Sequence, residues 1–254
     1  MLKKTFISIL TNLFLVGLFI SPAISQQEDF LAGYWAFDEG KGDEVKDQSG
    51  NGNDGTITGE VKWVDGQVGK ALEFSPGACV SIPDSEPLND VKELTVAMWV
   101  KLHSLPNDWS HLLEKDGSYA FTVNADETFR YTYSSSQAWL ETGFTVKEET
   151  WYYIAMSWGT SGGVFYVDGA KEHEDEGEVV VANVVLNIAH CGSYLVDGII
   201  DEVKIWNKAL TEEEINVAMR GGAAVNSTDK LATIWSQIKS GKPESQKAGK
   251  PEKR

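Results

Sequence analysis

The chain has 254 residues, a formal net charge of −16 and 11% aromatic residues. This length allows one large all-β domain or two small ones. The acidic residues concentrate between positions 26 and 222, which argues against nucleic acid and anionic membrane surfaces as partners and suits divalent cations and neutral ligands.

The N-terminus has the three parts of a secretory signal peptide. Lys3 and Lys4 precede an apolar run from Phe6 to Ile20, and Ala23 and Ser25 occupy the small-residue positions of a cleavage site. A run of about 15 residues is short for a membrane span. We expect the first 25 residues to be removed, which leaves a secreted, periplasmic or cell-surface chain without a membrane span. The alternative is an uncleaved N-terminal anchor.

The first predicted strand, 31–37, leads into a loop at 47–55 that is rich in glycine and in oxygen-bearing side chains. Glycine and asparagine allow positive φ, so that backbone carbonyls can turn inward. Ca²⁺ takes about six to eight oxygen ligands from carboxylates, amides and main-chain carbonyls. The ligand spacing is not that of an EF-hand. The loop is therefore either a calcium-binding loop or a plain Asx-rich turn.

Alternation of apolar and polar residues predicts further short strands along the chain. In the clearest strand, 94–102, every second residue from Leu94 to Leu102 is apolar, and Asp168-Gly169 is a two-residue hairpin signal. About a dozen such segments without an alternating helical pattern predict an all-β, two-sheet antiparallel sandwich. The other predicted strands are 61–64, 70–74, 79–82, 110–115, 119–124, 127–133, 138–145, 151–158, 164–167, 179–188 and 198–206.

The last predicted strand contains a carboxylate in an apolar setting. Alternation places Asp201 on one side with Val203 and Ile205, and Glu202 on the other side. A carboxylate among buried neighbours needs a hydrogen-bond partner or a cation. Either the amides of a nearby loop satisfy Asp201, or it is a metal ligand.

The residues after this strand predict one short helix and a change of composition. Thr211-x-x-Glu214 is a capping box, and Gly221-Gly222 ends the helix. We expect a signal peptide at 1–25, one domain at 26–222 and a basic tail at 223–254, with a short amphipathic helix at 229–239 followed by disorder.

Cys79 and Cys191 are the only cysteines. Because an exported chain meets oxidising conditions, we expect one disulfide between them. A pair of unrelated buried thiols is the alternative.

Seven short motifs follow one another along the chain: Tyr34-Trp35-x-Phe37-Asp38-Glu39-Gly40, Asp47-x-Ser49-Gly50-Asn51-Gly52-Asn53-x-Gly55, Gly69-Lys70-Ala71-Leu72-x-Phe74, Leu94-Thr95-Val96-x-x-Trp99-Val100, Trp151-x-Tyr153-x-Ala155, Tyr166-Val167-Asp168-Gly169 and Gly198-x-Ile200-Asp201-Glu202-Val203-x-Ile205-Trp206-Asn207-x-Ala209-Leu210. Together, over about residues 31 to 220, they resemble the laminin-G-like, concanavalin A-like lectin/glucanase jelly roll of secreted bacterial proteins. The resemblance implies a jelly roll with adjacent first and last strands. It also implies a structural calcium site with Asp38, Asp47, Asn53 and Asp201 as ligands.

The sequence argues against catalysis. The related glucanases carry Glu-x-Asp-x-x-Glu on the catalytic strand, whereas this chain offers only Asp201-Glu202, which alternation sends to opposite faces. A retaining glycosidase needs two carboxyl groups about 5–5.5 Å apart. We therefore expect no catalytic residue. The four histidines, His103, His111, His173 and His190, show no spacing typical of a catalytic triad or a metal site.

The favoured function is a non-catalytic binding module for carbohydrate or a cell-surface protein, with structural Ca²⁺. Aromatic faces stack on sugar rings. A glycan-active hydrolase or lyase and a structural or adhesive envelope protein are the alternatives. The ligand-binding candidates are Trp109, Tyr119, Tyr133, Trp139 and Tyr194, and packing in the core or at a sheet edge is the alternative for each.

Overall fold

The computed structural model describes residues 30–89, 92–133, 139–177, 179–180 and 182–221. The predicted signal peptide, basic tail and helix at 229–239 lie outside these residues. Within the described part of the chain, no helix is long and apolar enough to cross a bilayer.

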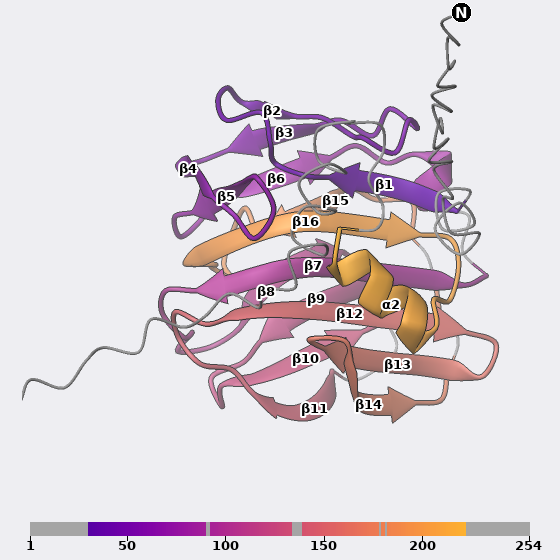
Figure 1. The fold of residues 1–254 in the computed structure, drawn as a ribbon. Helices are drawn as coiled ribbons and strands as arrows, with labels where there is room; N and C mark the ends of the chain where they lie inside the picture. Colours follow the sequence, from indigo (N-terminus) through magenta and orange to yellow (C-terminus); the bar gives the residue numbers. More distant parts are fainter. Residues whose placement is uncertain (1–29, 90–91, 134–138, 178, 181, 222–254) are drawn as a thin grey trace, which may run out of the picture.

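Two antiparallel sheets of eight strands each form the predicted sandwich (Figure 1). The first sheet, called sheet A, runs β14-β13-β12-β7-β16-β5-β4, and β1 pairs with β16. The second, sheet B, runs β11-β10-β9-β8-β15-β6-β3-β2. The strands of sheet A are β1 (Leu31–Trp35), β4 (Val61–Asp65), β5 (Lys70–Phe74), β7 (Leu94–Leu102), β12 (Trp151–Gly159), β13 (Gly162–Val167), β14 (Ala170–Asp175) and β16 (Gly198–Trp206). Those of sheet B are β2 (Glu44–Val45), β3 (Gly55–Thr58), β6 (Cys79–Ile82), β8 (Ser110–Lys115), β9 (Tyr119–Val123), β10 (Thr128–Thr132), β11 (Leu140–Thr145) and β15 (Leu186–Ala189).

The core between the sheets follows the predicted alternation in β7. Leu94, Val96, Met98, Val100 and Leu102 all belong to the main buried cluster. The hairpin at Asp168-Gly169 is confirmed between β13 and β14, and both turn residues have positive φ. The strand predicted at 179–188 is shorter than expected, because β15 begins only at Leu186.

A second apolar cluster covers the outer face of sheet A. Helix α2 (Glu212–Met219) lies over this face (Figure 1), and its Ile215 and Ala218 belong to the same buried cluster as Tyr153 and Trp206. Its predicted capping box is present: the Thr211 hydroxyl accepts from the Glu214 amide, and the Glu214 carboxylate accepts from the Thr211 amide. A short 3₁₀ turn, η1 (Glu86–Leu88), lies near β1.

A β-bulge in β16 corrects the predicted orientation of its two carboxylates. Asp201 pairs with Trp99 and Lys204 with Ala97 on β7, so three steps on β16 match two on its partner. Asp201 shares a face with Trp99, which packs on the outer cluster. The hydroxyl of Tyr34, in the same cluster, donates to Glu202. Asp201 and Glu202 therefore lie on the same outer face, and the prediction of opposite faces was wrong.

The predicted disulfide between Cys79 and Cys191 is confirmed. It joins β6 to the segment that follows β15, and 112 residues separate the two cysteines in sequence. A cross-link over so long a loop removes much of the chain entropy of the unfolded state.

Replacement of Cys191 by serine should lower the free energy of unfolding by about 2–5 kcal/mol, because the unfolded chain regains loop entropy. Urea unfolding of wild type and variant, each with and without reductant, measures the difference. Reductant should move only the wild-type midpoint. Equal midpoints for wild type and variant without reductant would contradict the expectation.

Candidate ligand-binding face

Asp47 and Asn53 organise the glycine-rich loop against β1. The Asp47 carboxylate accepts hydrogen bonds from the amides of Tyr34 at 3.0 Å, Ser49 at 2.9 Å and Asn53 at 2.9 Å. The Asn53 side-chain amide donates to the carbonyl of Ala32 at 2.9 Å. The protein's own donors thus occupy the Asp47 carboxylate on several sides.

Asp38 and Asp201 meet a different segment, the turn between β4 and β5. Asp38 Oδ1 accepts from the Lys70 amide at 2.8 Å, and Asp201 Oδ2 accepts from the Val68 amide at 3.0 Å. Asp201 is 0% exposed, and among the described residues its Oδ1 has no hydrogen-bond partner. Burial, assisted by the negative charge of Glu202, raises the pKa of Asp201 to about 8.

The four predicted calcium ligands thus fall into two pairs, one at the loop that follows β2 and one at the β4–β5 turn. Among the described residues, the carboxylates of Asp38, Asp47 and Asp201 do not gather within 4.8 Å of one another. Among the four predicted ligands, the buried Oδ1 of Asp201 is the atom whose missing hydrogen-bond partner a cation would replace. The calcium site stays a prediction.

The outer face of sheet B carries a different group of side chains. Cross-strand register aligns Glu141 with Arg130, Arg130 with Thr122, and Thr122 with His111. Directly paired residues share a face, so this row lies on the side away from the core. A parallel row passes through Glu114, Asn187 and Ser81.

Three of the predicted ligand-binding residues come together beside these rows. Trp109 precedes β8, Trp139 precedes β11, and their ring centroids lie 5.2 Å apart. The Tyr194 ring stacks on the His111 ring, with centroids 4.2 Å apart. The Trp139 ring centroid lies 5.1 Å from that of His111. We call Trp109, His111, Trp139 and Tyr194 the aromatic platform.

Backbone and charge contacts fix the platform to the sheet. The amide of His111 donates to the carbonyl of Tyr194 at 3.3 Å, which holds the segment after β15 against β8. The guanidinium of Arg130 lies 5.5 Å from the Trp109 ring centroid, within cation–π range, and pairs with Glu141 at 2.9 Å. Tyr194 is 37% exposed, so part of the platform faces solvent.

Tyr133 and Tyr119 are corrections to the predicted ligand set. Tyr133 is 0% exposed, its ring stacks on Trp158, and its hydroxyl donates to the carbonyl of Glu176 at 3.1 Å. Tyr119 is 1% exposed. Both lie in the main core cluster, because residues at alternate positions of β9 and β10 point inward. Neither ring can stack on a ligand.

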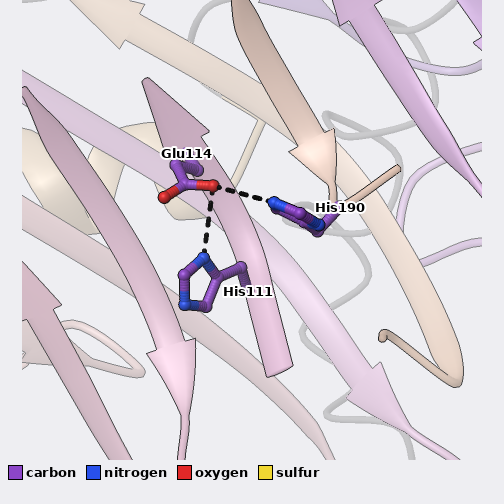
Figure 2. Close-up of side chains that lie close together, drawn as sticks. All are labelled: His111, Glu114 and His190. Atoms are coloured by element: carbon purple, nitrogen blue, oxygen red, sulfur yellow. Dashed lines mark ion pairs between the residues drawn. The ribbon is translucent and has the colours of Figure 1, made fainter. Parts of the chain in front are cut away.

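Sequence reasoning missed His111 of the platform and two residues that adjoin it, Glu114 and His190. Figure 2 shows one oxygen of Glu114 facing the rings of both His111 and His190. A bulge between His111 and Leu113 brings residues 111 and 114 to one face, where plain alternation would separate them. Burial opposes ionisation of Glu114, but the two imidazoles outweigh it and hold the pKa of the carboxyl below its ordinary value.

Two hollows lie away from the platform. One, of about 600 Å³, is lined by residues 40–43 and Trp63, and another, of about 590 Å³, by Phe30, Asn51 and Asn207. Neither is lined by a residue of the platform.

Comparison with known proteins places the fold. The family model of the concanavalin A-like lectin/glucanases superfamily, Laminin_G_3, matches residues 75–216, more than half of the chain. Among curated proteins, no sequence matches.

Several solved structures share the fold at low identity. Domain 4 of AbnA, a GH43 extracellular arabinanase from Geobacillus stearothermophilus, solved with arabinotriose, has a TM-score of 0.60 and 22% identity over 74% of this chain and 98% of that one. The binding domain of Paraclostridial Mosquitocidal Protein 1 has a TM-score of 0.66 and 17% identity over 77% of this chain and 53% of that one. Trypanosoma rangeli sialidase has a TM-score of 0.60 and 17% identity over 76% of this chain, which spans only 33% of the sialidase.

The family match covers β6 through most of α2, and the structural matches extend over about three quarters of the chain. The resemblance read from the motifs is thereby confirmed, and this chain belongs to the concanavalin A-like lectin/glucanases superfamily.

Proposed function

We propose that the chain is an exported, non-catalytic carbohydrate-binding module, and that the aromatic platform on sheet B is its binding face. The observation that carries the proposal is the gathering of Trp109, Trp139 and Tyr194 from three separate segments onto one outer face. A folded domain usually buries such rings in its core, so rings gathered on an outer face indicate a binding surface.

The chemistry of the face suits a sugar. Aromatic faces stack on the apolar side of a sugar ring, and a few polar groups fix its orientation. Arg130 and Asn187 lie on the rows beside the platform and offer such groups. The structural neighbour solved with arabinotriose makes arabino-oligosaccharides a rational first probe.

The arrangement of carboxylates supports a non-catalytic role. Asp201 and Glu202 share a face, but they are 0% and 2% exposed, and Glu202 is bonded to Tyr34 and to Lys204 at 2.7 Å. Near the platform, Glu141 pairs with Arg130, and Glu114 contacts two histidines. A glycosidase needs one carboxyl to protonate a leaving group and a second to act on the sugar.

Export is part of the proposal. A disulfide across 112 residues and the predicted signal peptide both suit an oxidising compartment. A structural Ca²⁺ is also included, held in part by Asp201, whose buried Oδ1 has no hydrogen-bond partner among the described residues.

Replacement of Trp139 by alanine should weaken glycan binding about fivefold or more, because loss of a central stacking ring costs more than about 1 kcal/mol. A glycan array that includes arabino-oligosaccharides selects the ligand, and calorimetry measures the dissociation constant. Trp151→Ala is the matched control: Trp151 is also half-buried, but it lies on sheet A.

The control should bind within about twofold of wild type. Failure of every glycan to bind the wild type, or equal losses in both variants, would refute the platform as a sugar-binding face.

Added Ca²⁺ should raise the melting temperature of the wild type, since a cation bound only by the folded state stabilises it by about 2.7 kcal/mol at a hundredfold excess over its dissociation constant. Asp201→Asn should abolish the shift. Differential scanning calorimetry in calcium and in chelator measures it. Identical wild-type melting curves in the two buffers would remove calcium from the proposal and leave the sugar-binding face unaffected.

A further inference from the structure

We propose that His111, Glu114 and His190 form a binding site for one transition-metal ion, with Zn²⁺ the favoured cation. Among the described residues, these are the only three His, Cys, Asp or Glu side chains whose ligand atoms all lie within 4.8 Å of one another. The site is separate from the predicted calcium ligands, which lie at the loop that follows β2 and at the β4–β5 turn.

The two separations to Glu114 match the edges of a coordination shell. His111 Nδ1 and His190 Nε2 each lie 3.3 Å from the same oxygen, Glu114 Oε2 (Figure 2). Ligands at about 2.0–2.1 Å from a tetrahedral zinc are about 3.3 Å apart along each edge. A charge-assisted hydrogen bond between imidazolium and carboxylate would be shorter, about 2.7–2.9 Å.

Burial provides an independent reason. His111 is 4% exposed, and its Nδ1, which is aimed at Glu114, has no hydrogen-bond partner among the described residues. A buried polar atom without a partner is costly. A cation placed between the two imidazoles and Glu114 would satisfy this nitrogen.

The backbone holds the three side chains in fixed positions. The bulge in β8 puts residues 111 and 114 on one face, and β15 pairs with β8 through Asn187 and Glu114. His190 directly follows β15 and precedes Cys191, which the disulfide ties to β6. Sites carried by paired strands are more precise than sites on loops.

The donor set indicates the class of cation. Two imidazole nitrogens and one carboxylate oxygen suit zinc and other first-row transition metals, whereas Ca²⁺ takes oxygen ligands. Three protein ligands leave the fourth zinc position for water or an external donor. The rings of Trp139 and Tyr194 contact the His111 ring, with centroids 5.1 and 4.2 Å away.

The test is calorimetric titration of Zn²⁺ into the untagged full chain after dialysis against chelator, with the zinc content confirmed by elemental analysis. We expect one Zn²⁺ per chain. Glu114→Gln and His190→Ala should each weaken binding at least tenfold. Both avoid the buried ring of His111, and circular dichroism and thermal melting of each variant check the fold.

His103→Ala is the matched control. His103 also lies between two carboxylates, Glu149 at 2.7 Å and Glu73 at 3.7 Å, but its two ring nitrogens face different partners. It should leave zinc binding unchanged. Absence of zinc binding by the wild type, or equal binding by wild type and both site variants, would overturn the proposal, as would loss of binding in the His103 variant.

Discussion

The structure depends on one closure, in which β16 joins both ends of the domain. β16 pairs with β7 along one side and with β5 and then β1 along the other. All nine of its residues are buried, so every polar backbone group must find a partner within the sheet. Residues 31–35 and 203–206 thereby pair in space, although they lie near opposite ends of the domain in sequence. Such non-local pairing is expensive in loop entropy and leaves little freedom elsewhere in sheet A.

The two outer faces of the sandwich carry different groups of side chains. Sheet A covers its outer face with α2 and with the cluster around Tyr153 and Trp206. There, the charged groups of Glu202 and Lys204 are buried and pair with each other. On sheet B, Trp109, Trp139 and Tyr194 gather on the outer face instead. One side of the sandwich is thus closed by packing, whereas the other carries a ring cluster that is open to solvent at Tyr194.

The fold was predictable because its strongest signals are local. Uninterrupted alternation identified β7, Asp168-Gly169 identified a hairpin, and Thr211 with Glu214 identified the start of α2. Strands with few apolar residues were not predicted. An example is β14, which reads Ala-Lys-Glu-His-Glu-Asp and is an edge strand that pairs with β13. An edge strand needs backbone partners more than it needs apolar side chains.

The candidate site was only partly predictable, and the reason is the β-bulge. Alternation assumes an unbroken pleat. An extra residue at Glu202 in β16 and another near Leu112 in β8 move the following side chains of each strand to the opposite face from the one that alternation predicts. The reversal puts Glu114 beside His111, and it puts Glu202 on the same face as Asp201. His190, which directly follows β15, joins from more than seventy positions later, so no spacing in the sequence could reveal the cluster. Trp109, Trp139 and Tyr194 were selected because they fall outside the predicted core pattern, and the structure brings their rings together, whereas Tyr133, just beyond the end of β10, is buried.

The bond between Cys79 and Cys191 has a consequence for the outer surface of sheet B. The cystine holds the stretch that bears His190 and Tyr194, while the main core contains few contacts from that stretch. Without the cystine, this stretch would keep its hydrogen bond and ring contact to β8 but would lose its covalent link to β6. The covalent bond that stabilises the domain thereby also fixes this part of the outer surface of sheet B.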